Sequence, residues 1–238
     1  MLIQPSFNAG PSTGATAISF PTQSGGTSPG GLEGIRADWN VRMNISHETG
    51  FVGGAGRLLI HNLVVDEKRE LVLLLPASLQ DRPGRLELAT VEVCSAKPGI
   101  AATPGQQLNF RMEGAKAVVT LPVLQLNDWV YLDLTWTGGF AQGGLSYPGA
   151  QVPVGDFHPQ IAVDVTTDTG LPGLALVSAR YDVELGSDLG CAVRIEHGEH
   201  VQVASRPNPD GTMTMHEFKS YGTARIDAML HPTGSLAG

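Results

Sequence analysis

The densest group of residues with metal-binding chemistry is the segment Glu196-His197-Gly198-Glu199-His200. Zinc peptidases use two histidines four positions apart on a helix, so that both rings face the metal. Here the two histidines are three positions apart, and Gly198 indicates a turn. On a strand, His197 and His200 would point to opposite faces. The spacing favours a surface turn, and a metal site at His197 and His200 is the less favoured alternative.

Other motifs with chemical potential are incomplete. His216-Glu217 and His47-Glu48 begin like the zinc motif, but neither is followed by a second histidine at the required position. No Gly-x-Ser-x-Gly nucleophile elbow occurs, and neither Cys94 nor Cys191 lies in a recognisable activating context. The sequence therefore predicts no catalytic residue, no cofactor and no resident metal.

Three further features have structural explanations. The segment Gly53-Gly54-Ala55-Gly56 lies at the start of a predicted strand, whereas phosphate loops precede a helix, so we expect a bulge or close backbone packing. Trp39, Trp129 and Trp136 lie on predicted strands, which favours core packing or cross-strand pairs over a sugar-binding platform. The two cysteines are far apart, and isolated thiols are favoured over a disulfide.

Composition narrows the possible partners. The 238 residues carry 15 basic and 23 acidic groups, a formal net charge of −8, with no basic cluster. Nucleic acid is therefore an unfavourable partner. No apolar run is long enough to insert into a membrane, and the N-terminus lacks the pattern of a signal peptide. We expect a soluble protein whose partner is protein, with its compartment undetermined.

Hydrophobic periodicity predicts an all-β fold. Trp39, Val41, Met43 and Ile45 alternate with polar residues, which is typical of a half-buried strand. Similar short segments separated by Gly and Pro follow along the chain, without a sustained helical period. These segments are 52–62, 71–75, 86–93, 108–112, 117–121, 130–136, 161–165, 174–185, 192–195, 200–204, 212–218 and 224–230. The pattern predicts an antiparallel β-sandwich.

The chain divides into an arm and a β-domain. Residues 1–36 are rich in Gly, Ser, Thr and Pro, which predicts either a flexible tail or an arm that orders along a neighbouring subunit. Residues 37–238 form the predicted sandwich. The Gly/Pro-rich segment 138–158 separates either two sheets of one sandwich or two small lobes.

The order of these strands resembles the N-terminal β-domain of the aminopeptidase N-type zinc metallopeptidases. The resemblance rests on Asp38-Trp39-Asn40-Val41-Arg42-Met43, residues 53–62 and 71–76, Tyr131-Leu132-Asp133-Leu134-Thr135-Trp136-Thr137-Gly138, Tyr181-Asp182-Val183-Glu184-Leu185 and Asp210-Gly211-Thr212. It would cover about residues 37–232. The HExxH zinc motif of the family's catalytic domain does not occur here, so the resemblance implies a scaffold lobe and assigns no active-site residue.

Three functional hypotheses follow. The first is a non-catalytic structural or interaction module that packs into a larger protein assembly, such as a virion or a surface layer. The second is an accessory lobe related to the metallopeptidase N-terminal domain, acting with a separate catalytic chain. The third, and weakest, is carbohydrate binding through the tryptophans.

Overall fold

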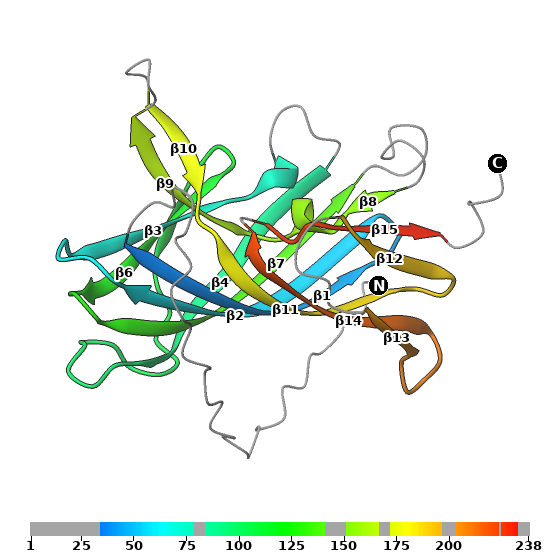
Figure 1. Ribbon diagram of the computed structural model, residues 1–238, viewed down its shortest axis with the longest axis horizontal. Helices are drawn as coiled ribbons and strands as arrows, with labels where there is room; N and C mark the ends of the chain where they lie inside the picture. Colours follow the sequence, from blue (N-terminus) through cyan, green and yellow to red (C-terminus); the bar gives the residue numbers. More distant parts are fainter. Residues whose placement is uncertain are drawn as a thin grey trace, which may run out of the picture. The chain divides into compact units, whose positions relative to one another are not determined.

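Three β-sheets make up the described part of the chain (Figure 1). The computed structural model describes residues 34–78, 84–140, 151–166, 172–196, 203–223 and 225–232. The largest sheet has seven strands in the order β13-β14-β11-β1-β2-β7-β4. Their bounds are Ala204–Pro207 (β13), Met213–Thr223 (β14), Ala179–Asp188 (β11), Ile35–Ile45 (β1), Phe51–Asn62 (β2), Trp129–Phe140 (β7) and Gly84–Ala96 (β4).

Two smaller sheets accompany the large one. A five-stranded sheet has the order β10-β9-β3-β6-β5, and a three-stranded sheet has the order β12-β15-β8. Their strands are Pro172–Leu176 (β10), Gln160–Thr166 (β9), Lys68–Leu74 (β3), Lys116–Leu124 (β6), Phe110–Glu113 (β5), Cys191–Ile195 (β12), Ala228–Pro232 (β15) and Val152–Pro153 (β8). Two short 3-10 helices are η1 (Pro76–Ser78) and η3 (Val154–Phe157). No helix in the described part of the chain has the length and apolar character needed to cross a bilayer.

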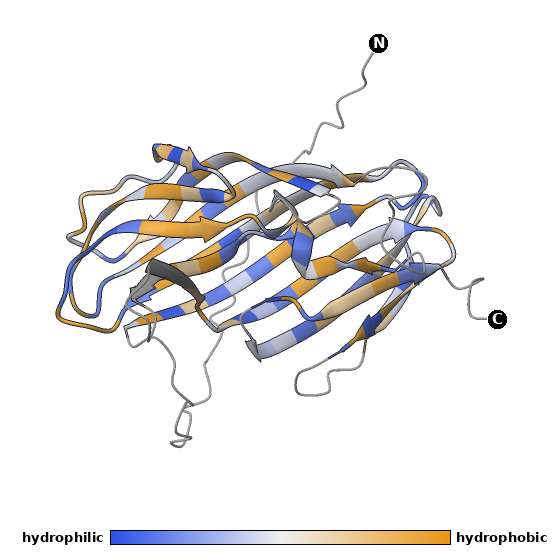
Figure 2. Ribbon diagram, turned by 90° about the horizontal axis from the view of Figure 1, so that it is seen from above, coloured by the Kyte–Doolittle hydropathy of each residue, from blue (hydrophilic) through white to orange (hydrophobic). Residues whose placement is uncertain are grey.

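Hydrophobic and hydrophilic residues alternate along strands of the large sheet (Figure 2), which gives the sheet an apolar inner face and a polar outer face. In β1, Val41 is buried, whereas its neighbours Asn40 and Arg42 are exposed, because successive side chains of a strand point to opposite faces. The inner face packs with side chains of the two smaller sheets, such as Leu73 and Leu230, in one apolar cluster. The predicted all-β sandwich is confirmed.

One strand pair departs from the predicted antiparallel arrangement. β1 and β11 pair in parallel, with Val41 opposite Val183, in the middle of the seven-stranded sheet. Parallel neighbours need a long crossover connection, and here strands β2 to β10 lie between the two. Alternation of apolar and polar residues is the same for both orientations, so the sequence pattern did not distinguish them.

Four predicted strands need correction. The strand predicted at 224–230 begins at Ala228 and continues to Pro232. The predicted strand 174–185 divides into β10 and β11 where the Val177 N–H bonds to the Ile161 carbonyl. The strand predicted from Leu108 begins at Phe110, and Met112 is 48% exposed rather than buried. Of the predicted strand 200–204, residues 200–202 lie outside the described residues, and β13 begins at Ala204 and continues to Pro207.

The β4 edge of the large sheet is covered. The Ser78 hydroxyl accepts a hydrogen bond from the Leu86 N–H and donates one to the Leu86 carbonyl. Residues 105–108 bond to the backbone of Val91 and Val93 further along the strand. Because exposed edge strands invite pairing with another chain, these contacts disfavour strand addition along β4.

Candidate protein-binding site

The histidines of the described residues are not grouped for metal binding. Within residues that the structure describes, no three His, Cys, Asp or Glu side chains are arranged to hold a metal ion. His197 and His200 lie outside the described residues, so the prediction about them stays a prediction. Cys94 and Cys191 are both free thiols, as the sequence favoured.

Two of the tryptophans are core residues that depend on glycines of β2. A Cβ atom on Gly54 would overlap with the Trp136 ring, and one on Gly56 would lie 3.1 Å from the Trp39 ring. Trp39 is 2% exposed and Trp136 is 1% exposed. The glycine segment therefore serves close packing, as predicted, and neither of these rings is available to stack on a sugar.

His158 occupies the same core. Its ring lies 4.6 Å from Trp39, 5.4 Å from Trp136 and 5.5 Å from Tyr181, measured between centroids, and all three contacts are edge-to-face. Burial lowers the pKa of His158 to about 3, so the ring is neutral at neutral pH. With 0% exposure, this imidazole cannot reach a substrate.

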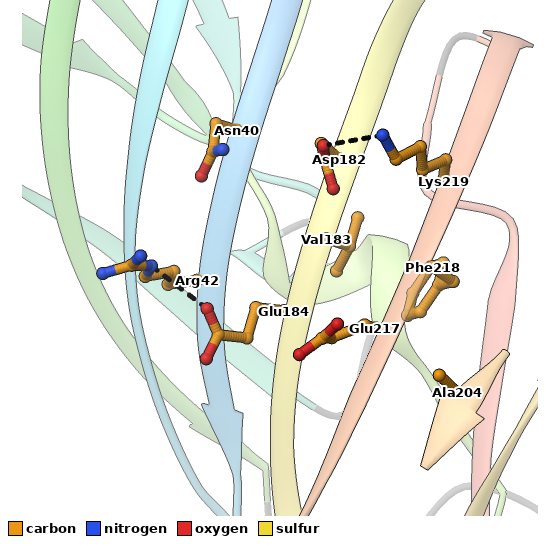
Figure 3. A pocket seen from close by; sticks show the side chains of 9 residues that line it. All are labelled: Asn40, Arg42, Asp182, Val183, Glu184, Ala204, Glu217, Phe218 and Lys219. Carbon is orange, nitrogen blue, oxygen red and sulfur yellow. Dashed lines mark ion pairs between the residues drawn. The ribbon is translucent and has the colours of Figure 1, made fainter. Parts of the chain in front are cut away.

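A polar hollow of about 460 Å³ lies on the outer face of the large sheet, over β1, β11, β14 and β13 (Figure 3). Glu184 and Glu217 are direct cross-strand neighbours there. Acid–base chemistry by two carboxylates requires that one of them holds a proton. Arg42 lies 3.2 Å from Glu184, and Arg206 is paired with Glu217. The two carboxylates are thus matched by two guanidinium groups, as in a structural charge ladder.

The same pairing continues along the outer face. Lys219 lies 3.3 Å from Asp182 (Figure 3), and the hydrogen bond to Asp182 raises the pKa of Lys219. Arg57 binds Asp133 through two hydrogen bonds of 2.8 and 2.9 Å. Charges that are neutralised by cross-strand partners favour a solvated face rather than a binding site.

A different arrangement occurs where β2 and β6 end. Asn62 is fully buried, and its side-chain amide donates to the carbonyls of Asp66 (2.9 Å) and Leu124 (3.0 Å). Its Oδ1 atom accepts a hydrogen bond of 3.2 Å from the Val64 N–H. The Asn62 backbone also bonds to Asp128 and Asn127, in the turn before β7. The Asn62 side chain thereby connects the β2–β3 loop to the end of β6 and the β6–β7 turn through hydrogen bonds. We call this the Asn62 junction.

Polar contacts outside Asn62 strengthen this junction. The Lys97 ammonium bonds to the Asp128 carboxylate at 3.0 Å and, together with the Gln125 N–H, lowers the pKa of that carboxyl. The Gln125 side chain donates to Glu67 across the two loops at 2.6 Å. The Gly34 carbonyl accepts a 2.7 Å hydrogen bond from Leu63.

The loops held in this way present apolar side chains to solvent. Leu63 and Val65 of the β2–β3 loop are 47% and 80% exposed. Val123 and Leu126, at the end of β6 and in the β6–β7 turn to which that loop is hydrogen-bonded, are 38% and 43% exposed. We call these four residues the apolar loop patch. A group of exposed apolar side chains on a fixed backbone is typical of a protein contact surface.

This patch was not predicted from the sequence. The segment Leu63-Val64-Val65 lies between a predicted strand and the acidic pair Asp66-Glu67. An apolar triplet directly after a strand-ending Asn was the available indication. Its exposure and the distant partner turn at Leu126 depended on tertiary structure.

Comparisons with known proteins found similarity in structure only. No protein-family model matches the chain, and no curated protein sequence matches it. A crystal structure of an M1 zinc metallopeptidase from Deinococcus radiodurans is similar, with a TM-score of 0.48 and 14% identity. A mutant of that enzyme bound to a Tyr-Ser-Ala substrate gives a TM-score of 0.46 and 13% identity. Both matches cover 84% of this chain and 42% of the metallopeptidase chain.

The predicted resemblance to zinc metallopeptidases is therefore confirmed as a partial resemblance in fold. This chain spans less than half the length of those metallopeptidases. At 13–14% identity and TM-scores of 0.46 to 0.48, the likeness concerns the β-fold alone.

Proposed function

We propose that this protein is a non-catalytic β-sandwich module that joins a larger protein assembly through its apolar loop patch. The observation that supports this most directly is the Asn62 junction. Hydrogen bonds from the buried Asn62 side chain hold two loops in place, and these loops expose apolar side chains to solvent. Fixing a contact surface before binding lowers the entropy that association must overcome.

A non-catalytic role agrees with the outer hollow and with the burial of His158. The paired carboxylates of the outer hollow each have a basic partner, and His158 is closed off in the core. The β4 edge is already bonded, so association by strand addition there is disfavoured. Removal of the apolar loop patch from water is favourable, because its four exposed side chains are apolar.

The test compares the patch with matched exposed apolar residues elsewhere. The triple variant L63S/V65S/L126S removes most of the patch, and the double variant M112S/L189S removes side chains of similar exposure, 48% and 59%, on β5 and the β11–β12 turn. Light scattering across a concentration series measures association of each. We expect the wild type and the double variant to associate and the triple variant to remain monomeric.

The outcome also separates the two kinds of assembly. A wild-type protein that is monomeric at high concentration contradicts self-assembly. The accessory-lobe alternative, in which the partner is a different chain, then takes its place. If the triple variant associates as strongly as the wild type, the patch is not the interface and this proposal fails.

A further inference from the structure

Three side chains, one each from β11, β14 and β13, are hydrogen-bonded in a row on the inner side of the large sheet. His216 of β14 lies between two serines: its Nε2 atom is 2.9 Å from Ser187 Oγ and its Nδ1 atom is 2.8 Å from Ser205 Oγ. Ser187 and His216 are fully buried, whereas Ser205 belongs to the exposed edge strand β13. These hydrogen bonds therefore connect a buried base to the hydroxyl of a residue on an exposed edge strand.

One tautomer of His216 links the three side chains into a path for a proton. The Ser187 hydroxyl lies 2.9 Å from His216 Nε2 and 3.3 Å from the Asp188 carbonyl, which can accept its proton. With the imidazole proton on Nε2, His216 donates to the Ser187 oxygen, and the lone pair of Nδ1 faces the Ser205 hydroxyl.

This is the order of groups that activates a serine: nucleophile, base and a residue that orients the base. Burial lowers the pKa of His216, so the ring is in its basic form at neutral pH. The cross-strand neighbours of His216 are the apolar Leu185 and the neutral Ser205. Glu217, next in sequence, is exposed and paired with Arg206.

We propose that Ser205 is a nucleophilic hydroxyl that accepts an acyl group from activated esters or thioesters. In the step, Ser205 Oγ forms a bond to the acyl carbon and the bond from that carbon to the leaving oxygen or sulfur breaks. The Ser205 proton passes to His216 Nδ1 and then to the leaving group. This acceptor site is independent of the apolar loop patch and of the proposed assembly.

The expected reaction stops after one transfer. In serine hydrolases a buried carboxylate stabilises the imidazolium formed in each cycle, and its replacement by a neutral group lowers the rate by about 10⁴-fold. Ser187 is such a neutral group. An activated ester has a good leaving group and still reacts, whereas the serine ester that forms has a poor one and is hydrolysed very slowly. We therefore infer covalent modification of Ser205 in a one-to-one ratio, rather than turnover.

The experiment uses p-nitrophenyl acetate with the full-length protein. We expect release of one equivalent of p-nitrophenolate per chain and one acetyl group on Ser205, located by peptide mass spectrometry and removed by hydroxylamine as an ester. The S205A variant should lose the label, and S205T should retain part of it. Acetylation confined to lysines, or equal in S205A and wild type, overturns the proposal.

A second set of variants tests the base. H216Q should slow acetylation by about 10²-fold or more, and S187A, which leaves His216 in place but frees its tautomer, should slow it by a smaller factor. The rate should fall on acidification as Nδ1 becomes protonated, with a midpoint below the ordinary histidine pKa. If H216Q fails to fold, S187A and the pH profile decide: an unchanged S187A rate together with a pH profile lacking this midpoint contradicts the role of His216.

Discussion

Asn62 and His158 are both fully buried polar side chains, but they differ in how many hydrogen bonds their polar atoms make. The Asn62 amide donates two hydrogen bonds and accepts a third. Within the described residues, neither ring nitrogen of His158 has a hydrogen-bond partner. A buried polar group without a partner costs about 1–3 kcal/mol, whereas a satisfied one adds to stability.

The difference shows which contacts hold each region of the fold in place. The core around His158 is held by packing, and its edge-to-face aromatic contacts accommodate a neutral imidazole. The loops around Asn62 bury little apolar surface of their own, so hydrogen bonds must hold them. Directed polar contacts thus appear where the chain leaves the sheets and exposes its apolar loop patch.

The largest expected effect is loss of stability in acid, caused by His158. The unfolded chain binds a proton at this residue below about pH 6.5, but the native state does so only near pH 3. Stability from this group is complete above pH 6.5 and falls between these values by about 1.4 kcal/mol per pH unit. Urea denaturation at several pH values measures the slope.

The H158F variant is the control for that slope. A phenyl ring keeps the aromatic contacts and removes the titrating group, so the dependence on pH should become shallower. A smaller slope remains, because burial also lowers the pKa values of His216 and His61. Identical slopes for H158F and wild type would show that acid acts elsewhere.

Removal of the Asn62 amide should be the next largest effect. N62L leaves the Val64 N–H and the Asp66 and Leu124 carbonyls without their partner, which should cost about 2–4 kcal/mol of unfolding free energy. The matched exposed substitution N109L should change stability by less than about 0.5 kcal/mol. Denaturant titration measures both, and a loss below about 1 kcal/mol for N62L would contradict the junction.

Substitutions at His158 and at Asn62 should change the unfolding free energy in opposite directions at neutral pH. Because His158 lacks a hydrogen-bond partner among the described residues, H158F should raise the unfolding free energy by about 1–2 kcal/mol near pH 7. Thermal denaturation at constant pH provides the measurement. A clear decrease would mean that the imidazole makes a favourable contact that phenylalanine cannot replace.

The sequence was sufficient for most of the fold and for little of the site. Alternation in segments such as 39–45 and 130–136 fixed both the strands and their buried faces, because burial of one face is a local property of the pattern. The parallel pairing of β1 with β11 depends on residues far apart in the chain. No local pattern encodes it.

The site residues were hidden for the same reason. Asn62 was interpreted only as the end of a strand, and its three partners span residues 64–124. His158 lies at the end of the Gly/Pro-rich segment 138–158, and its aromatic neighbours come from three strands, β1, β7 and β11. Ser187 and Ser205 were not predicted as site residues, because the reactivity of a serine depends on the side chains that contact it in the folded protein.

The smallest expected effect concerns the turn that Asn62 holds. Asn127 in the β6–β7 turn has φ +63°, a left-handed conformation that Asn tolerates and most residues avoid. N127A should cost about 1 kcal/mol, whereas N127G, which is free to adopt this φ, should be nearly neutral. If both variants lose the same stability, the Asn127 side chain matters more than its backbone. If neither does, the turn relaxes, and the backbone around Leu126 is less fixed than the Asn62 hydrogen bonds imply.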